Sequence, residues 1–270
     1  MNKPFLKWAG GKYRVLPQLL PLIGNPKRYC EPFAGSLATA LNVESDEYIL
    51  NDLNSDIINL YNHLIDSPTF ISEGEEYFEE DTNQKDVFYK QRDYFNNGTD
   101  LKQKAFLFVY LNRHCFNGLT RYNKKGRYNV PFGKNSKPYY PKIEMENFRE
   151  YFSTKNVQFT THSFEDDSLY QNLEHGDVVY FDPPYIPISV TSGFTNYTGE
   201  DFTYEQQVEL VELSIRLNDK GIKVIISNHD VPLARELYKN AKIYELQVSR
   251  SIAAKGSSRK KVNEVIAVFE

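Results

Sequence analysis

A strand that must end in a rigid turn is the most constraining feature of this sequence. The run Asp177–Phe181 is apolar and rich in β-branched and aromatic residues, which indicates a buried strand. It leads directly into Asp182-Pro183-Pro184-Tyr185, here called the acid–proline turn. Because neither proline has a backbone N–H, the ladder cannot continue and a carbonyl is left unpaired. Ligands bind outside the carboxyl ends of strands in open α/β sheets, so the sequence predicts a site at this turn.

The acid–proline turn carries a specific set of chemical groups. The carboxylate of Asp182 and one unpaired carbonyl are two acceptors, enough to hold an exocyclic amine. The ring of Tyr185 offers a face on which a planar base can stack. An ordinary strand-ending turn is the alternative, and the aromatic ring and the N-terminal motifs argue against it. We therefore expect Asp182, Pro183, Pro184 and Tyr185 to be the catalytic residues.

A second pattern lies near the N-terminus and is typical of nucleotide sites. A strand predicted at Arg28–Glu31 runs into a turn containing Gly35, followed by a helix predicted at Leu37–Val43. The next strand, predicted at Glu47–Asn51, ends at Asp52. A glycine turn followed by an acid at the next strand end is found where dinucleotides bind. The sequence has no GxGxxG and no P-loop lysine motif, which disfavours hydride transfer by a nicotinamide oxidoreductase and phosphoryl transfer.

Strand and helix patterns alternate along the chain and are interrupted once, which predicts an α/β fold with an insertion. We expect a catalytic core from residues 1–55 and 145–270. Residues 56–144 form an inserted, mainly helical domain, whose segment 113–141 reads as a long loop or β-hairpin. The remaining elements are expected as helices at Ile57–Ile65, Val87–Phe95, Lys104–Leu111, Tyr204–Leu217 (with a capping box from Thr203 to Gln206) and Leu233–Ala241, and as strands at Val157–Thr161, Lys223–Ser227, Ile243–Val248 and Val262–Val268.

Charge is unevenly distributed along the chain. The net charge is −4, yet residues 1–30, 121–142 and 250–261 carry lysines and arginines with no acid. Such basic blocks are the electrostatic footprint of a nucleic-acid partner. There is no apolar run of membrane-spanning length, and Cys30 and Cys115 make neither a disulfide framework nor a zinc pattern. A reducing cytoplasm is the expected compartment, and no metal is expected.

Taken together, the motifs resemble one family along nearly the whole chain. The chain resembles DNA adenine-N6 methyltransferases of the Dam type, the GATC-specific alpha group of the D12 class. The matching segments, in the family's order, are Phe5-Leu6-Lys7-Trp8-Ala9-Gly10-Gly11-Lys12, Glu31-Pro32-Phe33-Ala34-Gly35, Asn51-Asp52, Leu111-Asn112-Arg113, Phe116-Asn117-Gly118-Leu119, Arg121-Tyr122-Asn123, Asn129-Val130-Pro131-Phe132-Gly133, Asp182-Pro183-Pro184-Tyr185, Ser227-Asn228-His229-Asp230 and Ser257-Ser258-Arg259-Lys260-Lys261.

The resemblance implies a Rossmann-like core that binds S-adenosylmethionine as methyl donor and releases S-adenosylhomocysteine, without a metal. Asp52 is expected to hold the ribose hydroxyls, and Ser163 and Phe164 the adenine ring. A carboxylate and aromatic faces near the sulfonium agree with its positive charge. The residues expected to bind the cofactor are Trp8, Lys12, Phe33, Gly35, Asp52, Ser163, Phe164 and Asp182.

The resemblance also implies a double-stranded DNA partner and the sequence GATC. Arg121 is expected to read the outer guanine, with Lys7 at the first guanine, and the target adenine must be flipped out of the duplex. One asymmetric adenine requires only a monomer, and the setting expected is bacterial or phage-encoded. The residues expected to contact DNA are Lys7, Arg113, Phe116, Asn117, Leu119, Arg121, Asn123, Asn129, Pro131 and Lys134.

Three readings compete with GATC methylation at adenine N6. The same chemistry at a different recognition sequence is the first. The second is transfer to cytosine N4, which presents a similar exocyclic amine. The third is a non-catalytic nucleic-acid reader, against which the intact Asp182 and Tyr185 argue.

Overall fold

The structure is a computed structural model that describes residues 1–133, 137–187, 202–249 and 261–270. The chain divides into two compact units. The helical unit comprises Met1–Tyr13, Gly35–Leu41 and Asp52–Lys155, and the sheet unit comprises Arg14–Ala34, Asn42–Asn51 and Asn156–Glu270. The predicted insertion, residues 56–144, lies within the helical unit. Lys134 and the first four residues of the Ser257–Lys261 motif lie outside the described residues.

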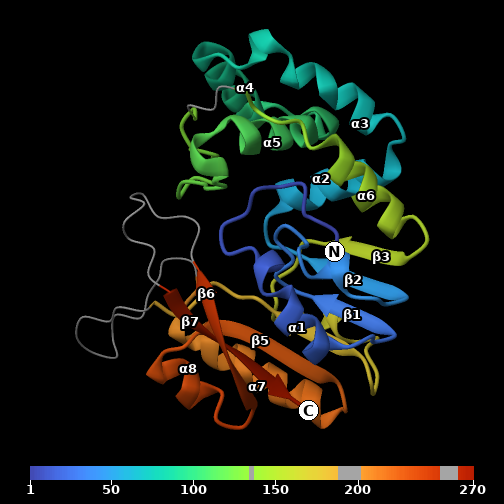
Figure 1. The fold of residues 1–270 in the computed structure, drawn as a ribbon, viewed down its shortest axis with the longest axis vertical. Coiled ribbons are helices and arrows are strands. Elements are labelled where there is room, and N and C mark those ends of the chain that lie inside the picture. The colour runs from blue at the N-terminus through green and yellow to red at the C-terminus, as the bar shows by residue number, and fades with distance from the viewer. Residues whose placement is uncertain (134–136, 188–201, 250–260) are drawn as a thin grey trace. The chain divides into compact units, whose positions relative to one another are not determined.

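The described part of the sheet unit forms a seven-stranded sheet in the order β3-β2-β1-β4-β5-β7-β6 (Figure 1). Neighbouring strands are parallel except for β7, which runs antiparallel to both β5 and β6. The chain therefore winds outward from β1 and then returns to β4, so the strand order switches direction between these two neighbours. The strands are β1 Arg28–Glu31, β2 Glu47–Asn51, β3 Asn156–Thr160, β4 Val178–Phe181, β5 Lys223–His229, β6 Lys242–Ser249 and β7 Lys261–Phe269.

Helices precede, follow and connect these strands. The first turn of α2 is capped by Asn54, whose side chain accepts from the Asp56 N–H, and α5 is capped in the same way by Asp100. In α7, Thr203 and Gln206 form the predicted capping box. The α-helices are α1 Leu16–Ile23, α2 Ser55–Asp66, α3 Phe70–Glu73, α4 Lys85–Asn97, α5 Leu101–His114, α6 Lys142–Phe152, α7 Tyr204–Asp219 and α8 Pro232–Leu237.

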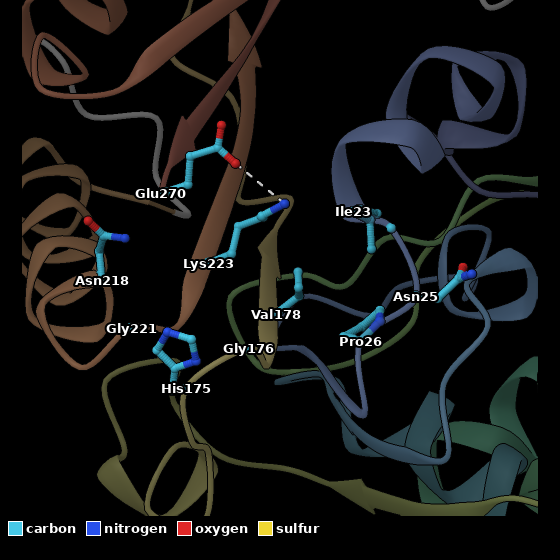
Figure 2. A pocket seen from close by; sticks show the side chains of 11 residues that line it. Ile23, Asn25, Pro26, His175, Gly176, Val178, Asn218, Gly221, Lys223 and Glu270 are labelled. Atoms are coloured by element: carbon cyan, nitrogen blue, oxygen red, sulfur yellow. Dashed lines mark ion pairs between the residues drawn. The ribbon is translucent and has the colours of Figure 1, made fainter.

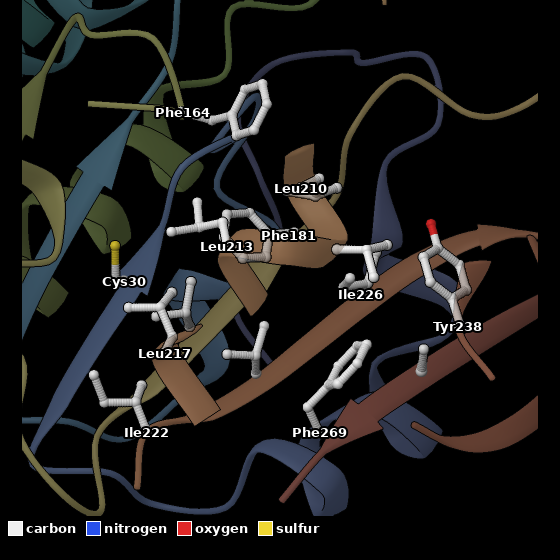
Figure 3. Packing of buried hydrophobic residues seen from close by; sticks show 14 of the residues in the cluster. Cys30, Phe164, Phe181, Leu210, Leu213, Leu217, Ile222, Ile226, Tyr238 and Phe269 are labelled. Atoms are coloured by element: carbon white, nitrogen blue, oxygen red, sulfur yellow. The ribbon is translucent and has the colours of Figure 1, made fainter. Parts of the chain in front are cut away.

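The main core of the sheet unit forms between α7 and one face of the sheet (Figure 3). Successive side chains of a strand point to opposite faces of the sheet, so every second residue lies on the face that α7 covers. Burying this surface contributes about 25 cal/mol per Å² of apolar area. The buried residues of this face include Val179, Phe181, Val224, Ile226, Val265, Ala267 and Phe269 from strands and Leu210, Leu213 and Leu217 from α7.

The α/β fold and most predicted elements are confirmed, but the helix predicted at Leu37–Val43 is wrong. Only a 3₁₀ turn at Ala40–Asn42 forms there. Gly35 has a φ of 46° and Leu37 a φ of 59°, and two such left-handed residues are incompatible with a right-handed helix. The segment is buried, so its apolar residues pack as an irregular loop.

The helical unit is built around aromatic packing between its helices and the N-terminal segment. The ring of Phe5 meets Tyr61 of α2 and Phe148 of α6 edge-on, with centroids 6.0 and 5.5 Å away. Asn112 of α5 then holds the next part of that segment. Its side chain accepts from the Lys7 N–H at 2.9 Å and donates to the Lys7 carbonyl at 2.8 Å. The N-terminal motif is therefore fixed to α5.

A pocket of about 540 Å³ lies in the sheet unit at the amino-terminal strand ends (Figure 2). Its wall includes Val178 and Lys223, the first residues of β4 and β5. Lys223 also forms an ion pair of 3.4 Å with Glu270. Because the acid–proline turn follows the other end of β4, this pocket is not the predicted site.

Candidate active site

The switch in strand order brings two predicted motifs to one edge of the sheet. Strands β1 and β4 are parallel neighbours, with Tyr29 opposite Val178 and Cys30 opposite Val179. Their carboxyl ends therefore lie side by side, where β1 runs into Pro32 and Phe33 and β4 runs into Asp182. This is the position at which open α/β sheets bind ligands.

The acid–proline turn is partly exposed at this edge. Asp182 and Tyr185 are half-buried, Pro183 is buried and Pro184 is exposed. The hydroxyl of Tyr185 donates to Glu264 Oε2 at 3.2 Å. Burial, followed by the negative charge of Asp182, raises the pKa of Tyr185 well above its usual value. Tyr185 is therefore a neutral phenol that presents a ring and a hydroxyl donor.

Phenylalanine rings gather next to the turn. The ring of Phe33 lies 5.5 Å from that of Phe164, 6.3 Å from that of Phe181 and 5.8 Å from that of Phe202. Phe33 remains half-buried, whereas the other three are buried. These residues come from four separate segments of the sheet unit, and together they form an apolar wall with one ring still accessible.

One buried amide organises the loops that carry Phe33 and Phe164. Asn51 at the end of β2 donates to the carbonyls of Pro32 and His162, both at 3.0 Å. Its Oδ1 accepts from the Thr160 hydroxyl and from the His162 N–H, at 2.9 and 2.8 Å. Asn51 thus fixes the loops that follow β1 and β3. Ser163, beside Phe164, is exposed. Asn51 precedes the predicted Asp52 and belongs to the Asn51-Asp52 motif, which itself gives no sign of this supporting role.

Within the helical unit, Asp52 lies against the glycine turn. Its Oδ2 accepts from the Gly35 N–H at 2.8 Å and its Oδ1 accepts from the Asn54 N–H at 2.9 Å. Burial raises the pKa of Asp52, and these two backbone donors partly offset that rise. Each carboxylate oxygen keeps a second lone pair with which it can accept a further donor.

Gly35 is required by its surroundings. It has a φ of 46°, and a Cβ at this position would lie 2.7 Å from the indole Nε1 of Trp8. Its carbonyl accepts from the Tyr61 hydroxyl at 2.6 Å. Trp8 is half-buried, while Lys12 is buried and its Nζ donates to the Gly10 carbonyl at 2.8 Å. Trp8 and Asp52 therefore lie against Gly35, whereas the contact given for Lys12 is with Gly10.

The predicted recognition segment contains a short hairpin. Tyr122 pairs with Tyr128, and the Asn129 N–H donates to the Arg121 carbonyl at 3.1 Å. The turn between them is closed by Asn123, whose Oδ1 accepts from the N–H groups of Lys125 and Arg127. The side chain of Arg121 is exposed and its Nε donates to Asn129 Oδ1 at 2.7 Å.

Side chains of α2 and α4 hold this hairpin. Asn96 of α4 donates to the Tyr128 carbonyl at 3.0 Å and accepts from its N–H at 2.7 Å. Tyr122 donates to Asp56 Oδ2 in the first turn of α2 at 2.8 Å. The hairpin is therefore a supported element rather than a loose loop.

The predicted DNA contacts differ in exposure. Arg113 is buried and its guanidinium donates to the Phe5 carbonyl, so it secures the N-terminal segment. Phe116 is 50% exposed although it is a large apolar residue, and Asn117 beside it has a φ of 56°. Lys134 lies outside the described residues. The exposed members of the predicted set are Lys7, Phe116, Asn117, Arg121, Asn123 and Pro131, and the half-buried ones are Leu119 and Asn129.

Comparisons with known proteins agree with the motif pattern. The family described as D12 class N6 adenine-specific DNA methyltransferase matches residues 8–252. This chain belongs to that family. The enzymes of this family depend on S-adenosylmethionine and methylate adenine N6 in DNA. Among the described residues, no cluster of histidine, cysteine and carboxylate side chains is arranged to hold a metal ion. Nor do the described helices include one long and apolar enough to cross a membrane.

Several relatives of this D12-class chain match over its full length. The DNA adenine methylase of Escherichia coli K12 is 42% identical, covering 100% of this chain and 96% of the relative. That of Serratia marcescens is 40% identical over 99% and 98%, respectively. That of Vibrio cholerae is 38% identical over 99% and 96%. Among solved structures, a rRNA methyltransferase from Streptomyces viridochromogenes has a TM-score of 0.40 at 12% identity and covers 100% of this chain and 91% of its own.

Proposed function

We propose that this enzyme methylates the adenine of GATC in double-stranded DNA, after the base has been flipped out of the duplex. One observation carries the proposal. The acid–proline turn stands at the β1–β4 switch point with its carboxylate half-buried and its tyrosine kept neutral. A base inside a duplex cannot reach such a turn, so the target must leave the stack.

The turn activates a weak nucleophile. The lone pair on adenine N6 is delocalised into the ring, which makes the amine unreactive. The carboxylate of Asp182 and the carbonyl of Pro183 accept its two N–H groups and thereby localise that lone pair on nitrogen. The ring of Tyr185 stacks on the base and holds it in place. Positioning and local electrostatics then supply most of the catalysis.

We assign residues of both units to the binding of S-adenosylmethionine. We propose that Asp52 accepts hydrogen bonds from its ribose hydroxyls with the lone pairs that Gly35 and Asn54 leave available. Phe33, Ser163 and Phe164 hold the adenine ring of the donor. The ring of Phe33, which is half-buried, offers its accessible surface for that contact. When bound, the donor supplies an electrophilic methyl group carried on a sulfonium.

Further cofactor contacts are assigned to Trp8, Lys12 and Gly35. A Cβ at Gly35 would collide with the Trp8 indole, so the glycine allows the indole to pack directly against the backbone. The indole of Trp8 offers an aromatic face that favours positive charge. The negative charge of the Asp182 carboxylate also stabilises the positive charge of the sulfonium.

We assign recognition of the DNA sequence to the predicted domain of residues 56–144. Arg121 projects from the hairpin and its guanidinium suits the O6 and N7 acceptors of guanine in the major groove. We assign Phe116 and Asn117, which are exposed, to contacts with base pairs or to wedging between them, together with Leu119 and Pro131. Because Arg113 is buried against Phe5, we leave it out of the contacting set.

The test is methylation of plasmid DNA from a host that lacks adenine methylation, with S-adenosylmethionine as donor. Nucleases that distinguish methylated from unmethylated GATC report the product. Protection at GATC supports donor, base and sequence together. Methyl incorporation into adenine without that protection would mean that the hairpin reads another sequence. Incorporation into cytosine N4 would contradict the assignment of the base, and no incorporation would favour a non-catalytic reader.

A further inference from the structure

The motif Ser227–Asp230 at the end of β5 lies next to the acid–proline turn. Phe181, the last residue of β4, stands opposite Ile226, and β5 continues beyond it to His229, alongside the acid–proline turn. On the other side of β5, Asn228 and His229 stand opposite Val265 and Glu264 of β7. The motif matches the family in sequence, but methyl transfer as described above gives it no task.

Asn228 is fully buried and both ends of its amide are engaged. Its Oδ1 accepts from the Ile186 N–H at 2.9 Å and from the N–H of His229 at 2.8 Å. Its Nδ2 donates to the Tyr238 hydroxyl at 2.8 Å and to Gln207 Oε1 at 3.4 Å. A buried amide with both ends satisfied has one orientation, and that orientation rigidifies its partners.

Gln207 extends this network from α7. It is buried, and because its Oε1 accepts from Asn228, its Nε2 is left to donate to the Pro184 carbonyl at 3.1 Å. The side-chain amides of Asn228 and Gln207 therefore hold two backbone groups of the chain immediately after Asp182.

His229 holds a third backbone group. Its Nδ1 lies 2.7 Å from the Ile186 carbonyl, which can only accept, so Nδ1 carries the proton. The imidazole also meets the ring of Tyr185 edge-on, with centroids 4.8 Å apart at an angle of 82°. Both backbone groups of Ile186 are thus bound to side chains from the end of β5.

The turn needs such support because of its own composition. Pro183 and Pro184 have no N–H, so the first backbone donors after Asp182 are those of Tyr185 and Ile186. A turn that is poor in donors cannot hold itself by backbone hydrogen bonds. Its geometry must come from side chains outside it.

We propose that Gln207, Asn228 and His229 are positioning residues for methyl transfer. They fix Pro184 and Ile186, and so keep the Asp182 carboxylate and the Pro183 carbonyl in the arrangement that the substrate amine requires. This inference rests on the proposed function. A displacement of about 1 Å at such a site can cost on the order of 100-fold in rate, so the effect should fall on the chemical step.

The experiment compares His229→Leu with His229→Asn. The asparagine amide keeps a donor near the place of Nδ1, and leucine removes it. We expect the single-turnover rate of methyl transfer at saturating donor and DNA to fall about 10- to 100-fold in the leucine variant. KM for DNA and Kd for S-adenosylmethionine should change less than about two-fold, and asparagine should restore most of the rate. His175→Leu, an exposed histidine before β4, is the matched control and should match the wild type.

A second variant keeps the test independent of folding at position 229. Gln207→Met preserves the side-chain length and removes the donor to Pro184, so it should lower the same rate with similar binding constants. Hydrogen exchange of the Ile186 amide should accelerate in both His229→Leu and Gln207→Met, whatever the DNA substrate is.

Two results overturn the inference. One is faster exchange at Ile186 with an unchanged transfer rate, and the other is a rate loss explained entirely by weaker donor or DNA binding. Failure of the proposed function is distinguishable, because there the wild-type enzyme itself transfers no methyl to DNA. In that case the exchange rate of the Ile186 amide still decides whether these side chains hold the turn.

Discussion

The hydroxyl of Tyr185 donates a hydrogen bond of 3.2 Å to the carboxylate of Glu264 on β7. The ring and the hydroxyl of this tyrosine therefore have separate tasks. The hydroxyl secures the side chain to the sheet, and we propose that the ring stacks on the base.

Tyr185→Phe separates these tasks, because it keeps the ring and removes the donor. We expect a loss of about 1 kcal/mol in the free energy of unfolding and a transfer rate within about three-fold of the wild type. Tyr185→Ala should lower the rate by roughly 10- to 100-fold, since stacking of a base contributes about 1–3 kcal/mol. Urea unfolding and single-turnover transfer measure the two effects. A phenylalanine variant as slow as the alanine variant would assign the hydroxyl, not the ring, to catalysis.

Asp182→Asn tests the carboxylate with almost no change in shape. An amide oxygen still accepts one hydrogen bond, but the negative charge that polarises the amine is lost. We expect the transfer rate to fall by roughly 10²–10³-fold while DNA binding changes less than about three-fold, by analogy with removal of one preorganised catalytic group. Rates and gel-shift titrations on the same oligonucleotide check this.

The control for Asp182→Asn is Asp219→Asn at the exposed end of α7, which removes the same charge elsewhere in the sheet unit. It should keep the wild-type rate. Substantial turnover in Asp182→Asn would sink the proposed role of the carboxylate.

The pKa of Asp52 predicts a pH-dependent stability. Burial raises this pKa above the value in the unfolded chain, about 3.9, so the folded state binds the proton more tightly. The free energy of unfolding should therefore fall as pH rises from that value through the raised pKa. The asparagine of Asp52→Asn cannot ionise. The free energy of unfolding of the wild type minus that of the variant should therefore decrease across this pH window and stay constant above it. Urea unfolding of both proteins measures it, and a difference that grows with pH would mean that the hydrogen bonds from Gly35 and Asn54 outweigh burial.

Gly35→Ala tests the close contact with Trp8. Alanine at a φ of 46° is strained, and its Cβ would lie 2.7 Å from the indole nitrogen. Gly126→Ala is the matched control, because Gly126 has a φ of 68° and nothing within 4 Å of the added atom. Backbone strain of about 1–2 kcal/mol is common to both. We expect Gly35→Ala to lose at least about 1 kcal/mol more, and to bind S-adenosylmethionine more weakly, in unfolding and calorimetric titrations. Equal losses in the two variants would show that the indole moves away without cost.

Local patterns in the sequence predicted the strands and most of the helices, because strand and helix periodicities are properties of neighbouring residues. The strands at Arg28–Glu31 and Glu47–Asn51 were predicted with the bounds observed. Helix α1 was missed because it contains Pro17 and Pro21. Pro17 lies in the first turn, where a proline costs no hydrogen bond, whereas Pro21 lies inside the helix. Helix α6 was missed because it follows the polar recognition segment.

The supports of the site could not be predicted in the same way. Asn51 binds the His162 backbone 111 residues away, and Asn228 binds the Ile186 backbone 42 residues away. Their partners are main-chain atoms, which carry no residue-specific signal. The strand order, which brings β1 next to β4, is a long-range property as well. Motifs therefore indicated the groups that we propose to react, while the residues that hold them emerged only from the fold.

Arg121→Ala tests how the hairpin reads DNA. The guanidinium is exposed, and its Nε donates to Asn129 Oδ1 within the hairpin. A bidentate contact to guanine discriminates by about 1–3 kcal/mol, so the variant should methylate GATC and sites altered at one guanine with nearly equal efficiency. Transfer rates on duplexes that differ at single positions measure this discrimination.

Lys125→Ala, in the exposed turn of the same hairpin, is the control for Arg121→Ala. We expect Lys125 to contact a phosphate, which carries no sequence information, so this change should weaken binding to every duplex alike and reduce the slope of log K against log salt by about one. Arg121→Ala could instead weaken binding to every duplex alike and leave discrimination intact. Arg121 would then bind the DNA backbone, and another residue of the predicted domain 56–144 would read the base. The two variants thus separate reading from clamping on one hairpin, because each removes one positive charge from it.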